Sequence, residues 1–248
     1  MSRIRVSATL AIIALAASAR PGNSQPPGTD PARPVVAIMN FTNGSLVDHE
    51  TYEPFSAGVA GMLLSELRSN PRISLVERER IRQVLDEQSL TRSGQVDAAT
   101  AAAVGKLLGA RHMIFGGFVI DRRGNLRIDA RAVNVETSLI EHVETVTDDA
   151  DNLFRAVERL GRQLSAGLRL SAGGAPEGAG SPTREAKQGQ VLANLKYARA
   201  LQEEDRKNSA KALQLYREFL AESPPDYAPI QRQAAEARIR AIASGGTL

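Results

Sequence analysis

The chain has 248 residues, of which 42% are hydrophobic and 24% charged, so it is long enough for one mid-sized globular domain and a smaller appendage. Its 31 basic and 28 acidic residues are spread along the chain and only 4% of residues are aromatic, which argues against the concentrated cationic face of a nucleic-acid-binding protein. The absence of cysteine excludes disulfides, thiol chemistry and thiolate metal ligands.

The N-terminus has the pattern of a secretory signal peptide. Arg3 and Arg5 precede an apolar run over residues 6–17, and the Ala-Ser-Ala sequence at 17–19 fits a cleavage site. This run is too short to span a bilayer comfortably, and no later segment approaches the ~20 apolar residues of a membrane helix. We therefore expect residues 1–19 to be a cleaved signal peptide. Since no cysteine follows the apolar run, we expect no lipoprotein anchor.

A linker, a strand and a helix are expected next. Residues 20–33 are rich in Pro, Gly, Asn and Ser, which is typical of a linker. The unbroken apolar run Val35–Met39 predicts a strand that is covered on both faces. The spacing of the apolar residues then changes to that of a helix. Four of them lie on one helical face: Val59, Met62, Leu63 and Leu67. This helix should end before Pro71, since proline disfavours α geometry in the residue before it.

The middle of the chain predicts one short strand and two helices. Residues 73–76 form the strand, and residues 77–88 form a helix with acidic residues in its first turn. Ser93-Gly94 marks a turn, and an alanine-rich helix should follow over 98–108. Gly109 stands where a helix C-terminal cap is expected.

Residues 113–147 predict a three-strand meander. The first strand, 113–120, contains Gly116-Gly117, which indicates a bulge or a close backbone approach. The second strand alternates apolar and charged residues over 126–132, the mark of a half-buried antiparallel strand. Asp151 should then cap a last helix. Its apolar stripe consists of Phe154, Val157, Leu160, Leu164 and Leu168.

These elements predict an α/β (α+β) domain over residues 34–170, with a mixed sheet of about five strands and packed helices. A second Gly/Ala/Pro-rich linker follows at 171–187, and residues 188–243 form a small all-α segment with three helices near 188–205, 209–222 and 229–243. The spacing of Ala200, Ala212, Tyr216 and Pro224 is similar to one tetratricopeptide-type (TPR-like) helix pair, although a helical hairpin of no particular family fits as well. A single repeat buries little by itself, so the tail should dock on the α/β domain or meet a partner.

Several segments between residues 75 and 116, in this order and spacing, resemble the CsgG family, named for the curli secretion component and related to FlgO-type and TolB N-terminal domains. They are Leu75–Arg78, Leu85–Gln88, Ser93-Gly94, Gly105–Ala110 and Ile114–Gly116. The resemblance covers roughly residues 34–168. It implies a periplasmic or outer-membrane location and a role in envelope assembly, through ring formation or contacts with other envelope proteins. We expect no enzymatic activity, on the separate ground of the residues discussed below.

Two departures from that family argue against a channel. Its secretion-channel members look like lipoproteins with an N-terminal cysteine, and they carry long amphipathic hairpins. This chain has no cysteine, and the connections at 121–125 and 136–138 have the length of tight turns. We therefore expect a periplasmic protein that associates with membranes at most peripherally.

The sequence predicts no catalytic, cofactor-binding or metal-binding residue. Asp48, His49 and Glu50 are adjacent, but neighbouring residues rarely converge on one ion without partners elsewhere, and His112 and His142 lack ligand spacing. The aspartates at 148, 149 and 151 precede a helix, where capping explains them. No nucleophile has a plausible base beside it.

Three hypotheses of function remain open. The first is a periplasmic adaptor whose α/β domain oligomerises or docks and whose helical tail supplies a partner groove. The second is an accessory of a curli-like secretion apparatus. The third is a ligand-binding or enzymatic domain that uses residues 40–52, because this loop leaves the end of a central strand, where α/β folds form crevices. If the tail serves a partner only, removal of residues after Leu170 should leave the α/β domain folded.

Overall fold

The computed structural model describes residues 33–87, 97–168 and 184–244, and describes the side chains of the last range from residue 190 onward. The predicted signal peptide (1–19), the turn at Ser93-Gly94 and most of both predicted linkers lie outside these residues.

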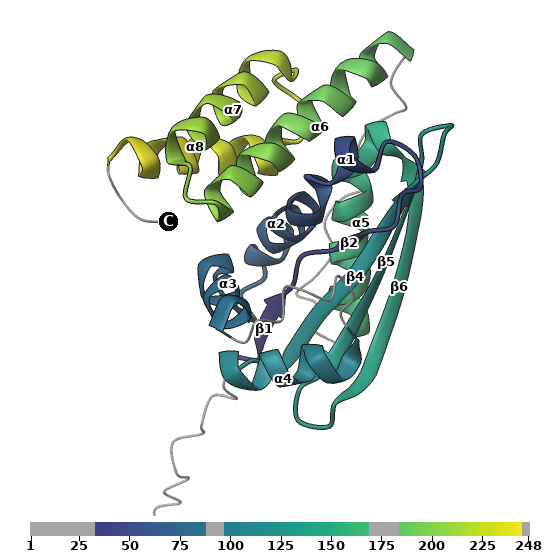
Figure 1. Ribbon diagram of the computed structural model, residues 1–248, viewed down its shortest axis with the longest axis vertical. Coiled ribbons are helices and arrows are strands. Elements are labelled where there is room, and N and C mark those ends of the chain that lie inside the picture. The colour runs from purple at the N-terminus through teal and green to yellow at the C-terminus, as the bar shows by residue number, and fades with distance from the viewer. Residues whose placement is uncertain (1–32, 88–96, 169–183, 245–248) are drawn as a thin grey trace, which may run out of the picture. The chain divides into compact units, whose positions relative to one another are not determined.

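A mixed open sheet of six strands forms the centre of the described chain, as the sequence predicts in type and nearly in number (Figure 1). The strands are β1 (Val35–Ile38), β2 (Thr42–Asn43), β3 (Ser74–Leu75), β4 (His112–Ile120), β5 (Asn125–Asn134) and β6 (Leu139–Asp149). Their order is β3-β1-β4-β5-β6, with β2 paired to β4. The first strands pair in parallel, whereas β4, β5 and β6 form the predicted antiparallel meander.

Helices cover the sheet and form the tail. Those of the α/β part are α1 (His49–Tyr52), α2 (Phe55–Arg68), α3 (Arg78–Glu87), α4 (Ala98–Leu108) and α5 (Leu153–Gly167). The tail consists of α6 (Arg184–Asp205), α7 (Ser209–Glu222) and α8 (Pro229–Ala243). Among the described residues, none of these helices is both long and apolar enough to cross a membrane.

Two hydrophobic cores lie on opposite faces of the sheet. Successive side chains of a strand point to opposite faces, so β1 contributes Val36 and Ile38 to one core and Ala37 to the other. On the first face, α2 and α5 pack on Ile114 and its neighbours. On the second face, α3 and α4 pack on Met113 and the start of β4. This arrangement confirms that β1 is buried on both sides.

The glycines behave as the sequence predicts. Gly109 ends α4 in the left-handed conformation with φ 65°, and its N–H donates to carbonyls of the last turn. Gly116 marks a close backbone approach rather than a bulge, because a Cβ there would lie 2.0 Å from the carbonyl oxygen of Asp129 while the β4–β5 register runs without a shift.

The predicted cap of the last domain helix is wrong by one residue. Asp151 lies inside a 3-10 turn, Ala150–Asn152, and α5 begins at Leu153 with Asn152 in the cap position and no capping side-chain hydrogen bond. The tertiary contacts of this turn explain the difference, since the backbone carbonyl of Asp151 accepts hydrogen bonds from Asn194 and Tyr227 of the tail.

The tail packs directly on the α/β domain. Gly58 and Gly61 let α6 approach α2 closely, because a Cβ on either glycine would lie 2.6 Å from Ala198 or Leu201. The tail's buried residues, such as Tyr197, belong to the same core as α2 and α5. Sequence reasoning left open whether the tail docks on the domain, and these contacts settle that it does.

Candidate functional site

Part of the second face of the sheet has none of the described helices over it. The 11 residues of α4 reach about 16 Å, whereas a 10-residue strand such as β5 is about 34 Å long. The helix therefore covers only the start of β4 and the end of β5. We define the open face as the side chains left uncovered there: Val119, Arg127, Asp129, Arg131, Val143, Thr145 and Thr147.

The strand register places these side chains in neighbouring rows. One row across β4, β5 and β6 consists of Val119, Arg127 and Thr147. A second row consists of Phe115, Arg131 and Val143. The side chain of Val119 is 42% exposed and that of Val143 is 55% exposed. The open face thus combines exposed apolar groups with charged and hydroxyl groups.

Hydrogen bonds order the polar groups of the open face. Arg127 donates from Nε and Nη2 to the carboxylate of Asp129, at 2.8 Å for the shortest contact of each nitrogen. Thr145 Oγ1 donates to the same carboxylate at 2.7 Å. The hydrogen bonds from Arg127 are the main reason that the pKa of Asp129 lies below its usual value. Asp129 therefore remains ionised and paired, which makes it a poor general base.

Strand β6 forms one edge of the sheet. It pairs with β5 on one side and with no described strand on the other. Its residues Leu139 and Ile140 are 67% and 44% exposed. An edge strand offers a row of unpaired backbone groups, and natural proteins often protect it with lysine or proline. Residues 139–149 contain neither lysine, arginine nor proline, but they contain four acidic residues: Glu141, Glu144, Asp148 and Asp149.

The histidines take part in separate ion-pair contacts. Nδ1 of His112 contacts Glu141, and Nε2 of His142 lies 2.7 Å from Glu144. Nε2 of His49 lies 4.0 Å from Glu53, which caps the C-terminal end of the same short helix α1. Within the described ranges, no three His, Asp or Glu side chains gather as metal ligands would.

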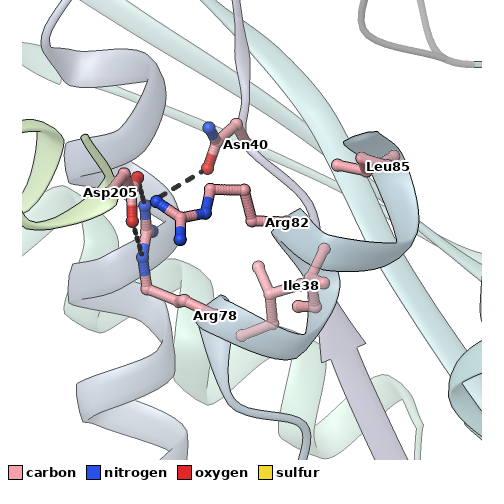
Figure 2. A pocket seen from close by; sticks show the side chains of 7 residues that line it. Ile38, Asn40, Arg78, Arg82, Leu85 and Asp205 are labelled. Carbon is pink, nitrogen blue, oxygen red and sulfur yellow. Dashed lines mark hydrogen bonds and ion pairs between the residues drawn. The ribbon is translucent and has the colours of Figure 1, made fainter. Parts of the chain in front are cut away.

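The loop predicted to form a crevice, residues 40–52, reaches one small pocket (Figure 2). The pocket has a volume of about 120 Å³. Its lining consists of Ile38, Asn40, Arg78, Ile81, Arg82, Leu85 and Asp205. Arg78 donates from Nε to Asp205 at 3.3 Å and from Nη1 to the carbonyl oxygen of Ala57 at 2.9 Å, while Arg82 pairs with Glu79. Arg78 thus joins α3 to α2 and α6, whereas Arg82 is paired within α3.

The rest of that loop is fixed by its own hydrogen bonds. Asn43 Nδ2 donates to the carbonyl oxygen of His49 at 2.9 Å, and the hydroxyl of Ser45 accepts from the backbone N–H of Ile120 at 2.9 Å. The loop therefore places Asn40 at a pocket, as predicted, but gathers no nucleophile and base there.

Sequence reasoning did not single out the open face or the β6 edge. The signal was present in the alternation of β5, whose Arg127, Asp129 and Arg131 were recognised as one exposed face. The exposed Val119 and Val143 were not predictable from it, because their exposure depends on how far α4 extends over the sheet.

The family comparison matches this fold. Residues 22–121 match the model of the family described as "Curli production assembly/transport component CsgG". The expected resemblance to this family is therefore confirmed for residues 34–121, whereas residues 122–168, which it was also expected to cover, lie outside the match. A search of curated proteins found no match.

Solved structures with some similarity include bacterial LpoB and a bacterial lipoprotein. The LpoB C-terminal domain from Escherichia coli is 12% identical, with a TM-score of 0.36, over 47% of this chain and 83% of that one. An NMR structure of E. coli LpoB is 16% identical, with a TM-score of 0.37, over 46% of this chain and 55% of that one. Lipoprotein GNA1162 from Neisseria meningitidis is 11% identical, with a TM-score of 0.31, over 46% of this chain and 79% of that one.

Proposed function

We propose that this protein is a non-catalytic adaptor of the bacterial envelope, which binds another envelope protein through its open face and the edge of β6. The observation that carries the proposal is the contrast between the two faces of the sheet. The first face is buried under helices, whereas the second has exposed side chains and borders β6, whose outer edge pairs with no described strand. The match to the CsgG family supports the envelope location and a role in assembly. We place the protein in the periplasm on this basis.

The edge strand favours a partner of defined chemistry. An extended segment could add to the sheet along β6, with main-chain hydrogen bonds for affinity and side-chain contacts for specificity. The acidic residues of β6, which has no basic residue, complement a segment that alternates basic and apolar residues. Pairing of β6 with a second copy of itself would instead bring four acidic residues of each strand together, which like-charge repulsion disfavours.

Site-specific photocrosslinking in cells tests the proposal. A photoreactive amino acid replaces Val143 on β6 or, as the control, Leu107 on α4, which is similarly apolar and 51% exposed. Crosslinked proteins are identified by mass spectrometry. We expect a discrete envelope protein linked at Val143 and absent at Leu107, and we expect Arg127→Glu to weaken that link. Identical crosslinks at both positions, or crosslinks only to the chain itself, would contradict the proposal.

The family description favours one second candidate, an accessory role in a curli-like secretion apparatus. The same crosslinks separate the two candidates. A component of a secretion channel linked at Val143 would support the accessory role, and any other envelope protein would support the general adaptor.

A further inference from the structure

A second concave site lies between the α/β domain and the tail. It is a cleft of about 400 Å³ between α5 and the loop that joins α7 to α8. No residue of the open face or of β6 lines it. The lining comes from α2, α5, α6, the loop and α8, so the cleft exists only because the tail docks on the domain. We call it the tail cleft.

The wall of the tail cleft is apolar and fixed in place. The rings of Phe154 and Tyr227 lie 5.5 Å apart, and the hydroxyl of Tyr227 donates to Asn194 Oδ1 at 2.7 Å. Pro224 and Pro229 restrict the backbone on either side of Tyr227. The site is therefore largely formed before any ligand arrives, which lowers the entropic cost of binding.

The charged groups of the tail cleft are mainly acidic. Glu66, Glu158 and Asp226 line it, against the single basic residue Arg155. Glu158 is paired with Arg162 of the next helical turn. Gln231 Nε2 donates to Glu66 Oε1 at 2.9 Å, which holds that carboxylate at the wall. Glu66 and Asp226 thus give the cleft a negative potential.

We propose that the tail cleft binds an extended segment of another envelope protein that inserts a lysine or arginine side chain. Such a side chain has a long apolar stem and a charged head, so the stem packs on the aromatic and proline wall while the head meets the carboxylates of Glu66 and Asp226. The volume suits one such side chain with its neighbours, near the lower limit of small-ligand pockets. The proposal does not depend on the open face.

Nuclear magnetic resonance of the full chain tests this proposal with a defined probe. The probe is a short peptide of alternating leucine and lysine with blocked ends, and its twin carries Nε-acetylated lysines. We expect the probe to shift backbone amides of residues 152–158 and 224–231, and the acetylated twin to bind at least tenfold more weakly because it lacks the cation. Equal binding of both peptides, shifts confined to other residues, or no shifts with either peptide would overturn the proposal.

Matched variants locate the effect. The isosteric double variant Glu66→Gln with Asp226→Asn should weaken the probe about tenfold, because both carboxylates lose their charge. Glu236→Gln, on the exposed side of α8 and outside the cleft, should bind as the unaltered chain does. Val143→Lys on β6 should also leave probe binding unchanged, so failure of the open-face function is distinguishable from failure of this site. If the double variant binds normally while circular dichroism shows the native fold, the cleft is not the cation site.

Discussion

The two faces of the sheet differ most clearly at adjacent residues of one strand. On β4, Phe118 is 1% exposed and faces α2 and α5, whereas Val119 is 42% exposed on the opposite side. Two long helices and the tail behind them cover the first face. One 11-residue helix and the short α3 cover part of the second. Most of the described helices thus lie over the first face of the sheet, and part of the second face is exposed.

This difference indicates what each face contributes. Burial of apolar groups on the first face supplies stability at roughly 25 cal/mol per Å². Exposed apolar groups on the open face contribute little to stability and cost little to alter. Under the proposed function, the exposed side chains of Val119 and Val143 are the apolar groups that a partner would contact.

The largest expected effect comes from removing the tail, which would expose the first face. Deletion of residues after Leu168 removes the cover of α2 and the aromatic partners of Phe154. We expect loss of cooperative folding, because the deleted buried contacts are comparable with the 5–15 kcal/mol that stabilises a typical domain. Urea denaturation followed by circular dichroism measures it, with the full chain as reference. A truncated protein that unfolds in one sharp transition would show that the α/β domain folds without the tail and would contradict this prediction.

Much of this arrangement could be predicted from the sequence, because strong periodicity decides helix and strand. The apolar run at β1, the four residues on one face of α2 and the glycine cap after α4 each depend on local chemistry. The three tail helices were also predicted within a few residues of their observed bounds. The two-residue strand β2 was not predicted, since a strand of that length has no period to detect.

The docking of the tail and the sites it creates could not be predicted from the sequence. Gly58 and Gly61 gave no signal in the sequence, yet they permit the close approach of α6 to α2. The tail cleft joins Glu66 to Gln231, which are far apart in the chain. Such contacts depend on tertiary packing, on which local periodicity carries no information. The predicted cap of α5 at Asp151 was wrong for the same reason, because tertiary contacts with the tail fix that turn.

A smaller effect is expected from the ion pair that holds the tail to α3. The side chains of Arg78 and Asp205 are only 13% and 25% exposed, so removal of the cation leaves a poorly solvated carboxylate. We expect Arg78→Ala to lower the free energy of unfolding by about 2 kcal/mol, less than the 3–5 kcal/mol of a fully buried pair. The change is measured by urea denaturation.

Arg68→Ala is the matched control for this ion pair. Its pair with Glu77 is more than half exposed on both sides, so its loss should cost no more than about 0.5 kcal/mol. Equal effects of the two substitutions would mean that the ion pair between α3 and the tail is as weak as a surface pair, and that other contacts hold the tail.

The smallest expected effect concerns pH and Glu66, which lies between the covered face and the tail cleft. Burial is the main cause that raises the pKa of Glu66 above its usual value of 4.5, and the nearby Glu158 adds to it. The folded state therefore holds this proton more tightly than the unfolded state, so stability is greatest below pH 4.5 with respect to this group and falls as the pH rises through the folded pKa.

Glu66→Gln keeps the acceptor for Gln231 and removes the charge. We expect it to remove this part of the pH dependence and to raise stability at neutral pH by less than about 1 kcal/mol, because the group is partly solvated. Urea denaturation between pH 4 and pH 7 measures both changes. A variant that is less stable than the unaltered chain at neutral pH would mean that the ionised carboxylate is stabilised by its surroundings, and that the tail cleft already satisfies the charge that we assign to a ligand.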